Sequence, residues 1–140
     1  MVPNEREKAS FLKENILPIQ ESGKLNFLTK DSFQDMGISF DFVFGHTEAM
    51  TIPYIDYNGR TIVFAADLMP SSFHIPMPYV MAYDIRPLST LSEREILYTK
   101  VLEKNAFIFF EHDPNNELGT LKRNESGRIV LDQLIKVDEL

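Results

Sequence analysis

The chain has 140 residues, enough for one ordinary domain, and its 44% hydrophobic and 25% charged residues are values typical of a globular protein. Its net charge of −7 argues against nucleic acid or anionic lipid as a partner, and no apolar run approaches the roughly 20 residues that span a bilayer. The lack of cysteine excludes disulfides and thiol chemistry. The first residues form no apolar signal segment, so we expect a cytoplasmic protein, unless a longer chain carries a signal upstream of Met1.

The N-terminal region carries helix and strand signals of modest strength. Asn4 is a good N-cap, and it predicts a helix over residues 4–16 that Pro18 ends. Gly23 then turns the chain into a short strand predicted at residues 25–28.

The next region carries clearer β-strand signals. Alternating phenylalanines predict a strand at residues 38–44. Two β-rich runs over residues 51–66 are joined by Asn58-Gly59, a dipeptide that accepts the positive φ angles of a type I′ turn. We therefore predict a tight hairpin there. Its second run is almost wholly apolar, which suggests a strand buried on both faces.

Residues 67–88 contain four prolines, which disfavour a regular helix or strand and therefore predict a long ordered loop. Loops of this length within a compact domain are usually functional. A helix is predicted over residues 91–104, with Thr90 and Glu93 spaced as a capping box. The remaining elements are predicted as a buried strand at residues 106–110, a hairpin at residues 118–134 that turns at Ser126-Gly127, and a terminal helical turn.

Three residues with metal-binding side chains follow apolar strands: His46, Asp67 and His112. Sites gather where strands end, because a rigid sheet positions side chains there. Imidazole and carboxylate groups suit zinc, iron or manganese. Taken singly, however, each residue is more often a turn former or a hydrogen-bonding loop residue than a metal ligand. Spacing alone leaves both interpretations open.

The order of these residues resembles the C-terminal half of the metallo-β-lactamase superfamily. Gly45-His46-Thr47 comes first, an apolar strand closing on Asp67-Leu-Met-Pro70 follows, and Phe110-Glu-His-Asp-Pro114 comes last. The likeness runs from about residue 11 to residue 114. It implies an α/β fold in which residues 1–140 form the C-terminal part of one domain, half of a four-layer αβ/βα sandwich with a mixed sheet and flanking helices.

The resemblance also implies a set of roles. His46 would bind a first metal, His112 would bind a second, and Asp67 would bridge both as the catalytic carboxylate. The complete domain would hold two divalent ions, zinc before iron or manganese. In the family a metal-held hydroxide attacks an ester, lactone, thioester, amide, phosphoester or β-lactam bond of a small-molecule substrate. Glu111 and Asp113 are candidates for fixing the imidazole tautomers, and a simple solvent-facing position is open for both.

One departure from the family is clear. The signature His-x-His-x-Asp-His is absent, and with only three histidines in the chain it cannot be present. Zinc sites hold at least three protein ligands, so we expect a family-level hydrolase that is inactive as this chain alone. A lone half would expose an apolar sheet face. We therefore expect a truncated or fragmentary chain, or one that forms a dimer or pairs with a complementing N-terminal half.

The alternative is a non-catalytic binding or structural α/β module that kept the second half of the fold. Within the long loop, His74, Tyr79 and Tyr83 lie near the expected mouth of the site. Substrate contact and simple loop packing are both open for these three residues, and the role of Asp84 is open too.

Overall fold

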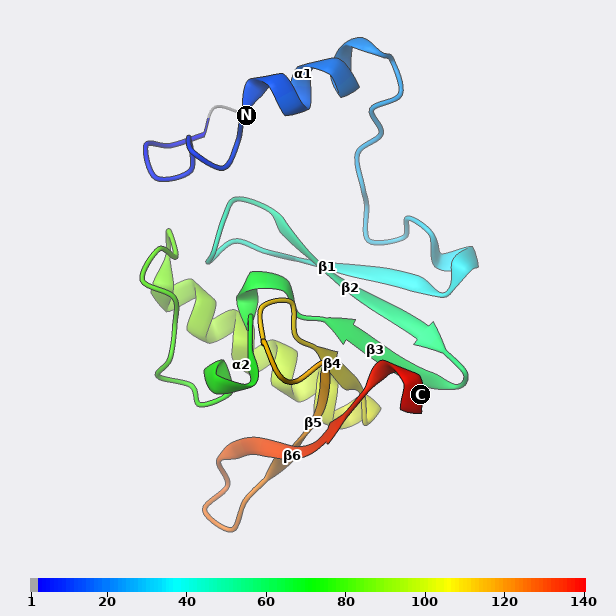
Figure 1. Ribbon diagram of the computed structural model, residues 1–140, viewed down its shortest axis with the longest axis vertical. Coiled ribbons are helices and arrows are strands. Elements are labelled where there is room, and N and C mark those ends of the chain that lie inside the picture. The colour runs from blue at the N-terminus through cyan, green and yellow to red at the C-terminus, as the bar shows by residue number, and fades with distance from the viewer. Residues whose placement is uncertain (1–2) are drawn as a thin grey trace.

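The computed structural model describes residues 3–140, which form a six-stranded mixed sheet with one long helix on one face (Figure 1). The strands lie in sequence order, and β3 and β4 are parallel while all other neighbours are antiparallel. Their bounds are β1 Ile38–Val43, β2 Met50–Tyr57, β3 Arg60–Phe64, β4 Phe107–Phe109, β5 Leu118–Arg123 and β6 Ile129–Ile135. The helices are α1 Lys13–Glu21 and α2 Pro87–Lys104, with short 3-10 turns at Gln34–Met36, Ala66–Leu68, Ser72–His74 and Val137–Glu139. The expected α/β class is confirmed.

Both predicted hairpins are present. Asn58 and Gly59 have φ angles of 50° and 75°, the left-handed values that a type I′ turn between β2 and β3 requires. Gly127 takes a φ of 78° in the turn between β5 and β6. The prediction that the strand after Asn58-Gly59 is buried on both faces is wrong, because only Val63 of β3 is fully buried.

The N-terminal predictions are wrong in detail. The helix begins at Lys13 rather than near Asn4, and Pro18 lies inside it instead of ending it. The predicted strand at residues 25–28 does not form. Helix α1 has no buried residue and stands apart from the sheet (Figure 1), so packing does not select its position. A short strand needs a hydrogen-bonded neighbour, and residues 25–28 have none.

Helix α2 starts four residues earlier than predicted. Pro87 occupies its first turn, where the missing N–H of proline costs nothing and its fixed φ suits a helix. The predicted capping box is therefore wrong: Thr90 is buried inside the helix, and Glu93 binds another segment of the chain. The start of α2 at Pro87 is not predicted from the sequence, because the prolines after residue 67 favour a loop.

The core lies between α2 and one face of the sheet. Alternate strand residues point to opposite faces, so this face collects the buried side chains of β2, β3 and β4, and α2 adds its own. The main members are Ile52, Val63, Leu97, Tyr98, Val101 and Ile108. None of the helices in residues 3–140 combines the length and apolar character needed to cross a bilayer.

The opposite face of the sheet is also apolar, but it is only partly covered. Ile55 pairs with Ile62 across β2 and β3, and Phe64 pairs with Phe109 across β3 and β4. These four side chains are partly buried, and the Phe64 and Phe109 rings stack with their centroids 5.6 Å apart. Within the described residues, this face has no helix packed on it to match α2.

Candidate metal centre

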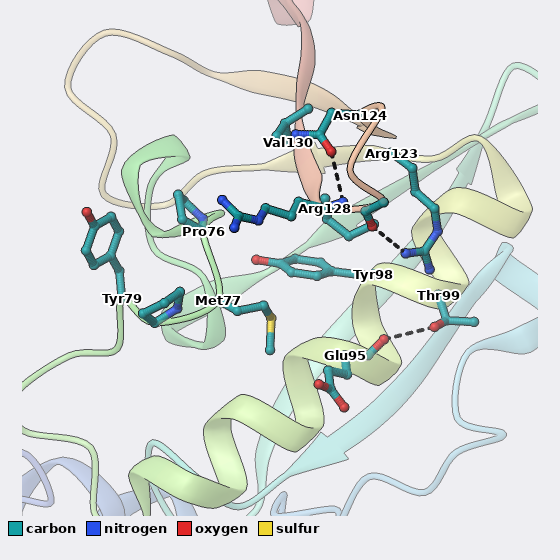
Figure 2. Close-up of a pocket in the computed structure, with 13 residues that line it drawn as sticks. Pro76, Met77, Tyr79, Glu95, Tyr98, Thr99, Arg123, Asn124, Arg128 and Val130 are labelled. Carbon is teal, nitrogen blue, oxygen red and sulfur yellow. Dashed lines mark hydrogen bonds between the residues drawn. The ribbon is translucent and has the colours of Figure 1, made fainter.

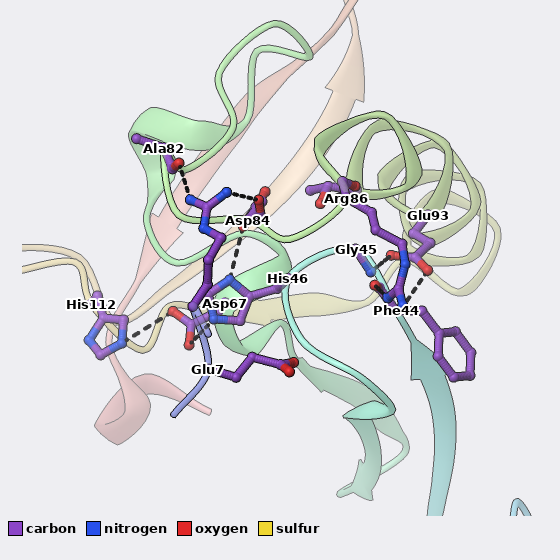
Figure 3. A network of polar contacts seen from close by, with 12 residues as sticks. Glu7, Phe44, Gly45, His46, Asp67, Ala82, Asp84, Arg86, Glu93 and His112 are labelled. Atoms are coloured by element: carbon purple, nitrogen blue, oxygen red, sulfur yellow. Dashed lines mark hydrogen bonds and ion pairs between the residues drawn. The ribbon is translucent and has the colours of Figure 1, made fainter. Parts of the chain in front are cut away.

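Strand direction brings the predicted ligands to one edge of the sheet. β3 and β4 are parallel, so Asp67 and His112, which follow them, lie at the same edge. β1 is antiparallel to β2, and β2 is antiparallel to β3, so β1 also ends at that edge and delivers His46 there. Three chain segments far apart in sequence thus converge at one place (Figure 3).

Asp67 lies between the two histidines. Its Oδ2 is 3.3 Å from His46 Nε2, and its Oδ1 is 3.4 Å from His112 Nε2. Each carboxylate oxygen therefore faces a different imidazole through the same type of ring nitrogen. The His46 side chain is 11% exposed, whereas His112 is 57% exposed, so the cluster is closed on the His46 side and open on the His112 side.

The buried carboxylate of Asp84 orients His46. His46 Nδ1 donates to Asp84 Oδ1 at 2.9 Å, and the other ring nitrogen, Nε2, is turned toward Asp67. This hydrogen bond is the largest influence on His46 and raises its pKa; burial acts in the opposite direction, and the charge of Asp67 adds to the rise. Asp84 Oδ2 has no hydrogen-bond partner within residues 3–140.

The peptide before His46 is held against helix α2. Glu93 accepts hydrogen bonds from the backbone N–H groups of Phe44 and Gly45, at 2.7 and 3.0 Å. Gly45 allows this close approach, because a Cβ at that position would lie 2.5 Å from the Thr90 nitrogen and 2.7 Å from its Cα. A side chain at residue 45 would therefore push the strand end, and His46 with it, away from the helix.

Asp67 and His112 are fixed by the loop that joins them to the rest of the fold. Ala66, directly before Asp67, has a φ of 46°, a left-handed conformation that costs a non-glycine residue on the order of 1 kcal/mol. Such strain persists only where the surroundings impose it, often at functional sites. The His112 N–H donates to the Pro70 carbonyl at 2.9 Å, which ties the two segments together.

Asp113 strengthens the same connection. Its carboxylate accepts hydrogen bonds from the backbone N–H and hydroxyl of Ser72, at 3.0 and 2.5 Å. Burial alone would raise the pKa of Asp113, but the hydrogen bonds from Ser72, Asn115 and Asn116 outweigh it and hold the pKa well below its usual range. Asp113 thus orders the loop and does not bond an imidazole. Glu111 lies closer to the cluster, with Oε1 3.9 Å from His112 Nε2.

The three candidate substrate contacts have different locations. Tyr83 packs edge-on against the His46 ring, with centroids 5.9 Å apart, and is 61% exposed. His74 Nδ1 is hydrogen-bonded to the Ser71 hydroxyl at 2.8 Å. The pKa of His74 is lowered, mainly by burial and to a smaller extent by the positive charge of Arg94. Tyr79 lines a separate cleft between α2 and the β5–β6 hairpin.

Several residues of the site escaped prediction from the sequence. Asp84 bonds His46, which lies 38 residues earlier in the chain, and Glu93 bonds a segment 48 to 49 residues earlier. No local spacing in the sequence reveals such contacts. The N-terminal segment also reaches the site: Arg6 donates to the Asp84 carbonyl at 3.3 Å, and buried Glu7 accepts from the Glu48 N–H at 3.3 Å. A charged residue outside any element gives no sequence signal for such a role.

The donor set fits a divalent cation. Two imidazole nitrogens and a carboxylate converge, and ligand atoms of Asp67, Glu111 and His112 all lie within 4.8 Å of one another. The hydrogen bond from His46 to Asp84 is the kind of support that metal-bound histidines usually have. In number, however, these residues are too few to complete two metal sites.

Comparison with solved structures identifies the fold. A probable metal-dependent hydrolase from Staphylococcus aureus is 27% identical, with a TM-score of 0.77 over 99% of this chain and 48% of its own. The hydrolase AbOPH, of the β-lactamase superfamily, is 20% identical with a TM-score of 0.73, over 89% of this chain and 43% of its own. AidC, a dizinc quorum-quenching lactonase, is 22% identical with a TM-score of 0.68, over 95% of this chain and 49% of its own.

The chain therefore has the fold of half of a metallo-β-lactamase domain, and its resemblance to that superfamily is confirmed. It spans about half the length of the solved structures that it matches, as expected for a C-terminal portion. No family sequence model and no curated protein sequence matches it. The likeness is therefore shown by comparison of folds.

Proposed function

We propose that His46, Asp67 and His112 are protein ligands of a two-metal hydrolytic centre, with zinc as the first candidate. The observation that carries this proposal is the position of Asp67, whose two oxygens lie 3.3 and 3.4 Å from Nε2 atoms of two different imidazoles. A carboxylate placed in this way can bridge two cations. When bound, such metals lower the pKa of water and offset negative charge that develops on the substrate.

The other residues of the site position these ligands. Asp84 keeps the His46 proton on Nδ1, so that Nε2 remains free to bind a cation. Glu93 fixes the backbone before His46, and Asp113 fixes the loop between Asp67 and His112 through Ser72. Tyr83, exposed beside the His46 ring, is placed to contact a substrate.

The remaining ligands would come from a second half of the sandwich. The partly exposed apolar face of the sheet around Ile62, Phe64 and Phe109 is the surface on which that half would pack. The matched solved structures are about twice as long as the region this chain covers, which supports a partner half of similar size. The half could belong to the same polypeptide or to another one.

Hydrolysis of a small-molecule ester or lactone is the reaction we propose for the completed centre. Two of the similar structures are described as a probable metal-dependent hydrolase and as a dizinc lactonase, which supports this reaction class. Reading the coding sequence in frame upstream of Met1 is a direct check. A His-x-His-x-Asp-His motif there would support the proposal, and a start codon with no such motif would count against hydrolysis by one polypeptide.

Zinc titration of the purified chain tests the ligands. We expect zinc binding by the chain to weaken more than about tenfold in Asp67→Asn, because the amide has no negative charge and offers one donor oxygen in place of two. Asp138→Asn is the matched control, since Asp138 is exposed in the C-terminal turn and makes none of the contacts described for the cluster. Equal zinc binding by both variants would refute the ligand assignment. Metal-free dimers in native mass spectrometry would favour a non-catalytic module instead.

A further inference from the structure

A second cleft lies between α2, the segment of residues 76–79 and the β5–β6 hairpin (Figure 2). It has a volume of about 990 Å³, at the upper end of the range for small-molecule sites. None of His46, Asp67, Asp84 or His112 lines it. It is therefore a separate cavity from the candidate metal centre.

Two arginines of the hairpin supply positive charge to this cleft. Arg128 extends across it toward Pro76, above the Tyr98 ring (Figure 2). Arg123 donates from Nη1 to the Gly127 carbonyl at 3.1 Å. Within residues 3–140 neither guanidinium has a carboxylate within 4.0 Å. In a chain of net charge −7, two arginines without a paired carboxylate give this cleft local positive charge that can attract an anion. The acidic residue among those that line the cleft, Glu95 of α2, forms no ion pair with either arginine.

The turn that carries Arg128 is well ordered by hydrogen bonds. The Asn124 N–H donates to the Arg128 carbonyl at 2.9 Å, and the Arg128 N–H donates to Asn124 Oδ1 at 2.9 Å. Asn124 Oδ1 also accepts from the Ser126 hydroxyl at 2.8 Å. The backbone at Arg128 is thus fixed before any ligand arrives, which lowers the entropy cost of binding.

The opposite wall is held by Arg94, a fully buried cation. It donates to the carbonyls of Tyr79, at 2.5 Å, Pro76, at 3.2 Å, and Ile75, at 3.3 Å, and to the Tyr98 hydroxyl at 2.9 Å. These bonds satisfy carbonyls of a segment that has no helix or strand partner of its own. Both walls of the cleft are therefore preorganised.

The rest of the lining is mixed, with an apolar part beside polar residues of α2 that include Thr99 and Glu95. Met77 and Ile129 line the cleft and pack against the core, and Val130 and Pro78 lie beside them. Burying an apolar group of a ligand here would remove water from both surfaces, which is favourable in proportion to the area covered. The lining thus suits a ligand with an apolar body and one charged end.

We propose that this cleft binds a small organic anion, whose compact apolar body lies on Met77 and Ile129 and whose carboxylate or phosphate head pairs with Arg128. Arg123 adds positive potential at the other side of the hairpin. The site shares no residue with the metal centre, so its test is independent of metal binding and hydrolysis.

The probe is 2-naphthoate, titrated into the ¹⁵N-labelled chain and followed by NMR. We expect shift changes concentrated in residues 76–79 and 123–130. The neutral 2-naphthylmethanol should bind at least about tenfold more weakly, because a charged head gains most from an arginine fork. A parallel titration with 2-naphthyl phosphate identifies the preferred charged group. If the phosphate binds more tightly than 2-naphthoate, the site prefers phosphate; if it binds more weakly, the site prefers carboxylate.

Two substitutions complete the test. Arg128→Gln should weaken naphthoate binding about five- to tenfold. Lys104→Gln removes the same charge at the end of α2, outside the cleft, and should leave binding unchanged. Equal binding of the neutral alcohol, equal weakening by Lys104→Gln, or shift changes centred on α1 instead of the cleft would overturn the proposal.

Discussion

Glu93 allows the sharpest test of how the fold positions His46. The carboxylate of this helix residue accepts the N–H groups of Phe44 and Gly45, at 2.7 and 3.0 Å, and so joins the end of β1 to α2. In Glu93→Ala the partly buried Gly45 N–H loses its partner, at a cost of about 1–3 kcal/mol, whereas the exposed Phe44 N–H can bond water instead. We therefore expect the free energy of unfolding to fall by about 2 kcal/mol.

Urea unfolding followed by circular dichroism measures this change. With a slope of about 2 kcal/mol per molar, the midpoint should fall by about 1 M. Glu103→Gln is the control, because Glu103 is exposed near the end of the same helix and should change stability by less than about 0.5 kcal/mol. A midpoint for Glu93→Ala equal to that of the control would refute the reasoning.

Two further predictions concern the metal centre and the loop beside it. Asp84→Asn removes the charge that orients His46, so zinc affinity should fall about tenfold to a hundredfold in a zinc titration; unchanged affinity would contradict the orienting role. The His74 pKa is lowered in the fold, so the unfolded chain takes up a proton first as pH falls. The contribution of neutral His74 to the free energy of unfolding is therefore fully present above its unfolded pKa of about 6.5. This contribution declines as pH falls below that value. Urea midpoints at pH 7.5 and 5.5 should differ less in His74→Gln than in the parent chain; an equal difference would argue against the shift.

Local chemistry made the central strands readable from the sequence. Asn58-Gly59 strongly favours a type I′ turn, because few other dipeptides accept two left-handed residues in a row. The strand ends that carry His46, Asp67 and His112 followed from apolar runs that stop at polar residues. Their order along the chain then pointed to the fold that the solved structures show.

Where tertiary contacts compete with local signals, predictions from the sequence are wrong. Pro87 and Pro18 were read as breaks, yet one begins a helix and the other lies inside one. Thr90 and Glu93 have capping-box spacing, but packing against β1 places Thr90 under Gly45 and turns Glu93 to the backbone of another segment.

The sequence by itself determined which residue types stand at the strand ends and which turns join the strands. Only the tertiary structure decided that Asp67 lies between two imidazoles, because that depends on β1, β3 and β4 running in the same direction. It also decided that Asp84 supports His46 and that Arg94 anchors a loop. Such contacts join residues up to dozens of positions apart, and the hydrogen bonds that fix them leave no periodic pattern in the chain.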